Sequence, residues 1–180
     1  MGLSNNALNK ECLKILLSAD IPLILDAGAF NIIAGSPYLF THKKARTILT
    51  PHSKELAVLM RCTSDEVLSE PIGMAIKAAE EYDSIVVLKM NKTIIASQSG
   101  DVKISDTKNN GMATAGSGDV LSGIICAGIA YTDSIYHAAC AGVYIHALSG
   151  LYAGKKYGGR YMNASDIIKS ISKAHKEIFD

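Results

Sequence analysis

The sequence lacks an excess of charge of either sign. Its 180 residues carry 18 Lys and Arg against 17 Asp and Glu, which gives a formal net charge of +1. A nucleic-acid-binding protein normally presents a basic surface, and so does a protein that binds an anionic membrane. The balance therefore predicts a small-molecule ligand, no nucleic-acid partner and no membrane partner.

Patterns typical of metal sites, disulfides and membrane spans are also missing. The four cysteines show no C-x-x-C spacing, so we expect neither zinc nor disulfides but reduced, buried thiols. The most apolar region, residues 120–153, is interrupted at residues 132–134 into pieces shorter than the ~20 residues of a membrane span. The first residues show no charged-then-apolar signal pattern, and repeats and low-complexity segments are absent. We expect a cytoplasmic protein with one domain, residues 1–180, and a sizeable core, because 48% of the residues are hydrophobic.

A glycine-rich segment, residues 109–125 (N-N-G-M-A-T-A-G-S-G-D-V-L-S-G-I-I), dominates what is present. Its small residues allow backbone N–H groups of Ala115–Gly118 to converge on an anion where an apolar helix begins, in a turn that we expect to be exposed. Asp119 falls in the first turn of that helix, where the helix dipole and neighbouring N–H groups favour a carboxylate. The spacing is neither a Walker A loop nor a dinucleotide fingerprint, and G-x-G-D alone also describes a capped helix start.

Alternating strand and helix patterns predict an α/β fold. The expected strands are residues 22–25, 47–50, 85–89, 93–97 and 102–105. The expected helices are residues 5–18, 30–34, 72–82, 117–131 and 134–152, two more that begin at Ser53 and Ser64, and a last one that Asn163 or Ser165 caps. The first helix should pack on the sheet through Leu8, Cys12, Ile15 and Leu16, and residues 157–160 should form a loop.

Three polar residues lie at or just after the ends of predicted strands, namely Asp26, His52 and Lys89. The carboxyl ends of parallel strands form the ligand crevice of open α/β sheets, so these side chains are candidate ligand contacts. A lone histidine or lysine at such a position is often only structural or solvated. His146 lies within an apolar helix, and we expect a core histidine with its hydrogen bonds satisfied.

Residues 111–125 closely resemble the anion-hole segment of the ribokinase-like carbohydrate kinases, and among them the NAD(P)H-hydrate dehydratases. Four further segments resemble the same family, namely residues 22–31, 49–56, 86–89 and 138–150. The resemblance covers nearly the whole chain and implies a ribokinase-like, three-layer α/β/α fold with a mainly parallel central sheet. Residues 1–4 resemble a glycine-rich turn that lies well inside the family domain, which implies an N-terminally truncated domain. Its open sheet edge would then be covered by homo-oligomerisation or by an upstream polypeptide.

The family resemblance also implies a reaction, the repair of NADH or NADPH whose nicotinamide ring has been hydrated. ADP or ATP phosphorylates the added hydroxyl group and phosphate then leaves, with Mg²⁺ implied by the nucleotide and no metal-ligand cluster in the sequence. Asp119 would be the catalytic residue that accepts the hydroxyl proton. The implied substrate contacts are Gly2, Asp26, Asn31, His52 and Asp119. The implied nucleotide contacts are Lys89, Met90, Asn91, Lys92, Thr93, Ala115, Gly116, Ser117 and Gly118.

Three residues depart from the family pattern. Gly28 stands where the family often has a second aspartate, and Lys54 and Met90 each replace a common glycine. Two alternatives therefore stay open. A kinase resembling hydroxyethylthiazole kinase would share G-S-G-D and leave a stable phosphorylated product, although T-P-H-x-x-E argues against it. A non-catalytic remnant of the fold would bind nucleotide without turnover.

Overall fold

The chain forms two compact units in a computed structural model that describes residues 3–107 and 110–179. The first unit comprises Met1–Met90 and Ile94–Lys103, and the second comprises Asn91–Thr93 and Ile104–Asp180. The organisation of residues 1–180 as one domain stays a prediction.

A five-stranded sheet runs in the order β1-β2-β3-β4-β5. Strands β1 (Pro22–Leu25), β2 (Arg46–Leu49) and β3 (Ser84–Leu88) are parallel, β4 (Thr93–Ala96) is antiparallel to β3, and β5 (Val102–Ser105) ends the order. Each predicted strand is confirmed to within one residue at either end, and so is the α/β class. The third layer of the predicted α/β/α arrangement stays a prediction.

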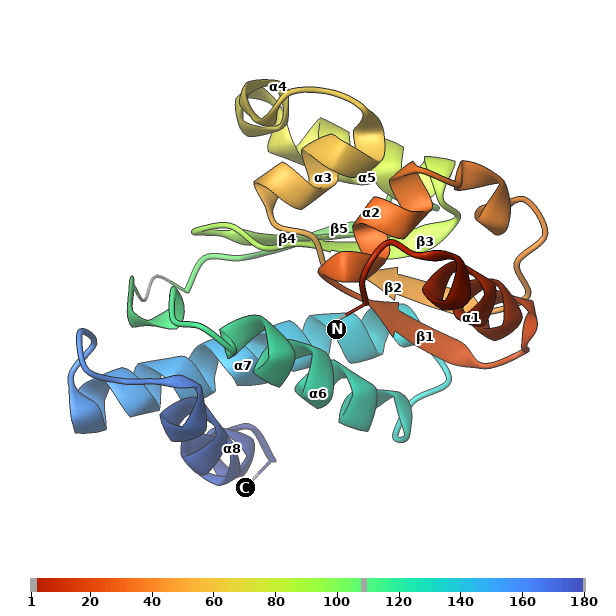
Figure 1. The fold of residues 1–180 in the computed structure, drawn as a ribbon. Coiled ribbons are helices and arrows are strands. Elements are labelled where there is room, and N and C mark those ends of the chain that lie inside the picture. The colour runs from red at the N-terminus through yellow and green to blue at the C-terminus, as the bar shows by residue number, and fades with distance from the viewer. Residues whose placement is uncertain (1–2, 108–109, 180) are drawn as a thin grey trace. The chain divides into compact units, whose positions relative to one another are not determined.

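Five α-helices belong to the first unit, α1 (Ala7–Ser18), α2 (Gly28–Ala34), α3 (Ser53–Met60), α4 (Ser64–Ser69) and α5 (Pro71–Glu81), together with the 3₁₀ helix η1 (Pro37–Phe40). Helices α2, α3 and α5 lie over the same face of the sheet (Figure 1). Their core includes Phe30, Leu56 and Ala78 against Leu49 and Val86, each at most 1% exposed. This apolar layer fixes the ends of the parallel strands, where the candidate ligand contacts lie.

The predicted packing face of α1 is wrong. Leu8 and Ile15 are 73% and 61% exposed, whereas Leu13 and Leu17 are buried at 1%. The helix carries two apolar stripes at helical spacing, and the periodicity does not distinguish them. The pair at positions 13 and 17 packs on the core, so the stripe containing Leu8 remains on the surface.

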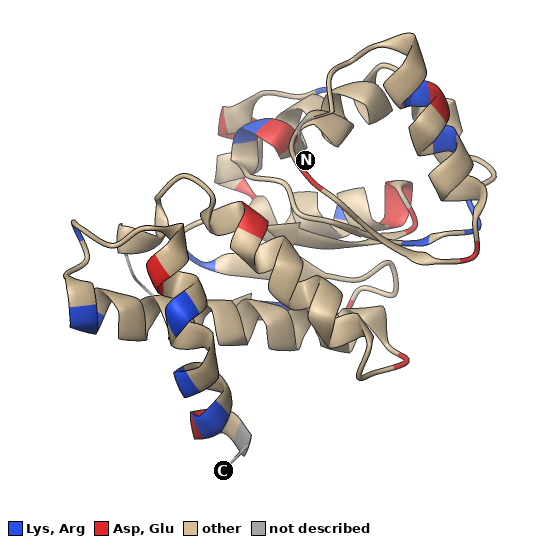
Figure 2. Ribbon diagram, turned by 60° about the horizontal axis from the view of Figure 1, so that its bottom comes forward, with Lys and Arg blue, Asp and Glu red and all other residues tan. Residues whose placement is uncertain are grey.

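The second unit contains helices α6 (Ser117–Ile129), α7 (Ile135–Tyr157) and α8 (Ala164–Phe179), preceded by the 3₁₀ helix η2 (Asn110–Met112). Its core includes Val120, Ala153, Met162 and Ile167. Tyr157 was expected in a loop but is the last residue of α7, and the loop begins at Gly158. In Figure 2, both acidic and basic segments occur on the helices of this unit. Within residues 3–107 and 110–179, no helix is both long enough and apolar enough to cross a membrane.

The prediction of buried thiols is wrong. Cys12 and Cys126 are exposed, and Cys62 and Cys140 are half-buried. Cys12 is exposed because, like Leu8, it lies on the face of α1 that does not pack on the core.

Candidate active site

The first unit brings Asp26, His52 and Lys89 to one edge of its sheet. These residues follow the parallel strands β1, β2 and β3, and the carboxyl ends of parallel strands lie at the same edge. The backbone continues the parallel pairing as a single bridge between His52 and Lys89. The N–H group of Lys89 donates to the carbonyl oxygen of Pro51 at 2.8 Å. Three of the predicted contacts therefore share a rigid backbone frame.

Lys89 forms an ion pair within this group. Its Nζ atom lies 2.8 Å from Oδ1 of Asp26 and 3.9 Å from Oε2 of Glu55. The side chain of Asp26 is only 6% exposed, and its Oδ1 atom also accepts a hydrogen bond from the N–H group of Ala27 at 2.8 Å. The lysine expected to contact a nucleotide is thus already paired with a residue expected to contact substrate.

His52 caps helix α3. Its Nδ1 atom accepts from the N–H group of Glu55 at 3.2 Å, and Oε2 of Glu55 accepts from the N–H group of His52 at 2.8 Å. This reciprocal capping box satisfies two backbone donors. Accepting at Nδ1 requires that nitrogen to be unprotonated, so the ring proton resides on Nε2, 3.5 Å from Oε1 of Glu55. Half of the side chain stays exposed, at 50%, so the ring still has a free surface.

A cavity of about 360 Å³ opens between α2 and α3. The residues that line it are Ala27, Gly28, Phe30, Asn31, His52, Lys54, Glu55 and Val58. It therefore brings together Asn31 and His52, two of the predicted substrate contacts. Asp26 directly precedes Ala27, which lines the cavity. Lys54, one of the departures from the family pattern, also lines this cavity.

Gly28 has a steric reason to lack a side chain. A Cβ atom at this position would lie 1.9 Å from the carbonyl oxygen of Leu3. The backbone of Leu3 therefore occupies the space that an aspartate side chain would need. Ala27, immediately before it, adopts the positive φ of 52° that turns the chain into α2. The neighbouring Gly2, a predicted substrate contact, lies outside the described residues.

The turn after Lys89 contains the other predicted nucleotide contacts of this region. Met90 is half-buried and packs against the core of the first unit. Asn91 and Lys92 are exposed, Thr93 opens β4, and Nζ of Lys92 pairs with Oδ2 of Asp106 at 3.0 Å. The exposed members of this turn leave a surface for a ligand, whereas Met90 serves packing.

In the second unit, a glycine turn starts helix α6. Gly116 has a φ of +84°, a left-handed conformation that glycine adopts without strain, and no side chain caps the helix start. The N–H group of Ser117 donates to the carbonyl oxygen of Thr114 at 3.2 Å. This bond engages one of the four predicted donors. The N–H groups of Gly118 and Asp119, in the first turn of the helix, are donors that an anion at the helix start would meet.

Asp119 lies in the first turn of α6 with its side chain half-buried. We expected neighbouring N–H groups to cap its carboxylate, but it has no hydrogen-bond or ion-pair partner among the residues that the structure describes. Its first-turn position places the carboxylate at the positive end of the helix dipole. The carboxylate is therefore available to an incoming hydroxyl group.

His146, on α7, contacts the same turn. Its Nε2 atom lies 3.3 Å from Oγ of Ser117, which is buried at 7% exposure rather than exposed as expected. Burial lowers the pKa of His146 to about 4, against the opposing effect of a hydrogen bond to the Ser117 backbone. His146 is half-buried rather than part of the core, and its Nε2 atom has a hydrogen-bond partner as predicted. Its contact with the glycine turn joins residues 29 positions apart, and the sequence carries no signal for it.

A resident metal ion does not fit these residues. Within the described part of the chain, no group of three or more His, Cys, Asp or Glu side chains could hold one. Any Mg²⁺ would therefore have to arrive with the phosphates of a nucleotide.

Comparison with known proteins identifies the family. A family model described as NAD(P)H-hydrate dehydratase matches residues 1–173. The chain belongs to the NAD(P)H-hydrate dehydratase family. A bifunctional NAD(P)H-hydrate repair enzyme, Nnr, of Moorella thermoacetica is 37% identical over 170 residues, which are 93% of this chain and 32% of the relative. The ADP-dependent (S)-NAD(P)H-hydrate dehydratase of Neisseria meningitidis is 39% identical over 131 residues, which are 71% of this chain and 44% of the relative.

Solved structures of the family share the fold. The ADP/ATP-dependent NAD(P)H-hydrate dehydratase of Bacillus subtilis, co-crystallised with ATP and Mg²⁺, is similar with a TM-score of 0.88 and 27% identity, covering 98% of this chain and 62% of that one. This similarity confirms the ribokinase-like expectation for the fold. The chain spans about a third of the length of the Nnr relatives.

Proposed function

We propose that this chain takes part in the nucleotide-dependent dehydration of hydrated NADH or NADPH. The single observation that carries the proposal is the start of α6, where a glycine turn without a side-chain cap precedes Asp119, whose carboxylate has no partner within residues 3–107 and 110–179. Phosphoryl transfer needs donors for the charge of the transferred group and a carboxylate beside the attacking hydroxyl, and this segment supplies both. The family relatives act on the same substrate class, which supports the assignment.

In the proposed reaction, the hydroxyl oxygen of the hydrated ring attacks the terminal phosphorus of ADP or ATP, AMP or ADP leaves, and the hydroxyl proton passes to Asp119. The N–H groups of Gly118 and Asp119 donate to the transferred phosphoryl group. Phosphate then leaves from the ring carbon and a proton leaves from the neighbouring ring carbon, which restores the double bond. Because a carboxylate at a helix start is a weak base, Asp119 acts mainly by orienting the hydroxyl group, with late proton transfer.

We assign substrate recognition to Asp26, Asn31 and His52, and also to Gly2, which lies outside the described residues. Nucleotide recognition is assigned to the exposed residues Asn91 and Lys92, together with Thr93 and the glycine turn, Ala115 to Gly118. Mg²⁺ would accompany the nucleotide and neutralise part of the charge on its phosphates.

One experiment tests the proposal against its alternatives. The purified chain is mixed with Mg²⁺, ADP or ATP, and hydrated NADH, and the recovery of NADH absorbance is followed alongside phosphate release. The proposal predicts one phosphate for each NADH recovered. A small-molecule kinase would instead consume nucleotide and accumulate a phosphorylated product. A non-catalytic remnant would bind nucleotide with no recovery of NADH.

The predicted homo-oligomer or upstream polypeptide, and the cytoplasmic location, remain proposals. Strand β1 stands at the end of the sheet order, and the stripe of α1 containing Leu8 and Ile15 is exposed, which are the features that such a partner would cover. Light scattering on the purified chain measures the oligomeric state. A monomer that is active without any added chain would overturn both partner proposals.

A further inference from the structure

Lys54 brings to the cavity between α2 and α3 a charge that no described residue neutralises. It is exposed and has no hydrogen-bond or ion-pair partner within residues 3–107 and 110–179. Glu55, which also lines the cavity, is engaged in the capping box with His52 and lies 3.9 Å from Nζ of Lys89. We infer that Lys54 binds a phosphate group of hydrated NADH or NADPH where this cavity opens to solvent. The inference rests on the proposed function and deepens it, because it adds a substrate contact that depends on charge.

The position of Lys54 is not explained by the stability of α3. Lys54 lies in the first turn of this helix, where the partial positive charge of the helix start disfavours a cation. The residues three and four positions further on, Ala57 and Val58, are apolar, so the helix offers no carboxylate at the spacing at which helical side chains meet. A side chain that departs from a local rule without a structural gain is a candidate for function. For a bound anion, the helix start and the ammonium group act in the same direction.

The size and lining of the cavity suit one end of a dinucleotide. Its volume of about 360 Å³ is near the lower end of the ~300–1,000 Å³ of small-molecule pockets, so part of a dinucleotide must stay outside. Phe30 and Val58 offer apolar surface to a ring. Asn31 and the Nε2–H group of His52 offer hydrogen bonds to a hydroxyl or a carboxamide. Because burying a phosphate without a partner is costly, the phosphates remain at the opening, where Lys54 is exposed.

Calorimetry with hydrated NADH and with hydrated NADPH, each without nucleotide, measures the contribution of this charge. Lys54→Gln should weaken the affinity for at least one of the two ligands by about fivefold at low ionic strength, and the loss should shrink as salt is added. Lys54→Arg keeps the charge and should stay within about twofold of wild type. Because Lys54→Gln removes a cation from the first turn of α3, it should resist urea at least as well as wild type does.

The two ligands also identify which phosphate is bound. Both contain the pyrophosphate of a dinucleotide, and only hydrated NADPH has a further phosphate on its adenosine ribose. An equal loss for both ligands indicates the pyrophosphate, and a loss confined to hydrated NADPH indicates the ribose phosphate; either result supports the inference. Lys77→Gln is the matched control, because Lys77 is also an exposed lysine on a helix of the first unit, α5, and does not line the cavity. It should change neither affinity.

The inference and the proposed function fail in different ways. Unchanged affinity of Lys54→Gln for both ligands, or an equal loss in Lys77→Gln, would overturn the inference and leave Lys54 as a solvated surface charge. Weaker binding of ADP with Mg²⁺, without a loss for either hydrated dinucleotide, would place Lys54 in the nucleotide site and overturn it as well. A wild-type chain that binds the hydrated dinucleotides but never recovers NADH would contradict the proposed function alone. One that binds neither of them would contradict both.

Discussion

The two candidate ligand regions differ in how their polar groups are satisfied. At the sheet edge of the first unit, Lys89 is paired with Asp26, and His52 is engaged with Glu55 in the capping box. At the start of α6 in the second unit, no side chain caps the helix, and Asp119 has no partner among the described residues. The first region is preorganised by its own contacts. The second leaves its strongest interactions to be made with a ligand, as expected where charge develops during a reaction.

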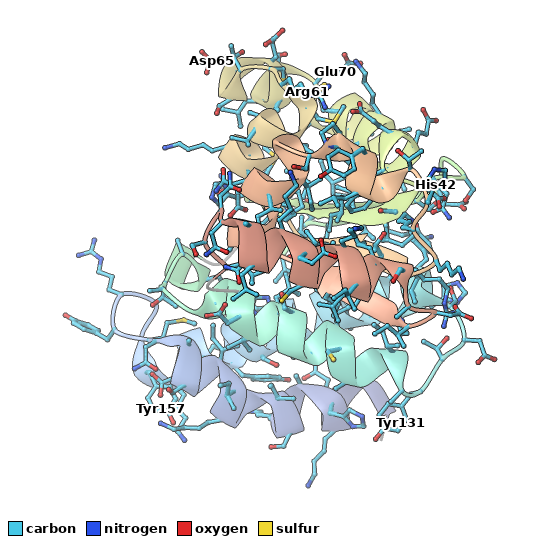
Figure 3. The ribbon with its side chains drawn as sticks, turned by 45° about the vertical axis from the view of Figure 1, so that its right-hand side comes forward. His42, Arg61, Asp65, Glu70, Tyr131 and Tyr157 are labelled. Atoms are coloured by element: carbon cyan, nitrogen blue, oxygen red, sulfur yellow. The ribbon has the colours of Figure 1, made fainter. Side chains whose placement is uncertain are left out.

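Asp119→Asn should produce the largest effect, because it removes a carboxylate of the second region that is not paired with any residue the structure describes. Turnover should fall by about 10²–10⁴, the usual contribution of a positioned acid or base, while ADP affinity stays within about threefold. Recovery of NADH absorbance and calorimetry measure the two quantities. Asp65→Asn is the control, because Asp65 also lies in the first turn of a helix, α4, and Figure 3 labels it among the outlying side chains. A turnover that survives Asp119→Asn would refute the assigned role.

The sequence predicted the local parts of both regions. Strand β1 ends before Asp26, as the apolar run indicated, and α6 begins at Ser117, as the glycine-rich segment indicated. Strand β3 ends at Leu88, one residue before its predicted end. These features depend on neighbours within a few residues, where propensity and spacing are informative.

Contacts between distant residues were not predictable in the same way. The pair Lys89–Asp26 joins positions 63 apart, and its formation depends on the register of three strands. The prediction of the packing face of α1 was wrong for a related reason. Two apolar stripes were available, and only the tertiary fold selects the one with Leu13 and Leu17. Family resemblance supplied residue roles, but it did not indicate that Leu3 fills the space beside Gly28.

The neutral His146 beside the glycine turn should make the stability of the chain depend on pH. Its pKa is about 4 in the folded protein, against the ordinary value of 6.5, so the unfolded chain binds the extra proton between these values. The contribution of neutral His146 to the free energy of unfolding is complete above about pH 6.5 and is lost as the pH falls toward 4, for a total of roughly 3 kcal/mol. Urea unfolding of wild type and His146→Gln across this range measures the loss. The difference in free energy of unfolding between the two proteins should become smaller as the pH falls. The exposed His42, labelled in Figure 3, provides the control His42→Gln, which should differ from wild type by less than about 0.5 kcal/mol at every pH. Parallel curves for wild type and His146→Gln would contradict the lowered pKa.

Gly116→Ala tests whether the conformation of the turn, and not only its composition, binds the anion. Alanine at a φ of +84° costs about 1–2 kcal/mol, and its Cβ atom would lie 3.2 Å from Cβ of Ala164. Gly100→Ala is a matched control, because Gly100 has a φ of +86° with nothing within 4 Å of the added atom. Both variants should lose similar stability in urea, but only Gly116→Ala should weaken ADP binding, by about tenfold. Equal ADP affinity in the two variants would remove the turn from the nucleotide site.

The smallest expected effect separates the two roles of His52 in the first region. His52→Ala removes the acceptor that caps α3 and should cost about 1 kcal/mol of stability, whereas His52→Asn keeps a capping oxygen and should cost less than about 0.5 kcal/mol. Both variants remove the half-exposed imidazole ring, so both should weaken the binding of hydrated NADH by a similar factor of about five. Urea unfolding and calorimetry report the two properties independently. If His52→Asn binds substrate as well as wild type does, capping alone explains the histidine, and the proposed substrate contact at this strand end is lost. If stability and affinity instead fall together in both variants, the first region is less preorganised than its capping box indicates, and its contrast with the open start of α6 weakens.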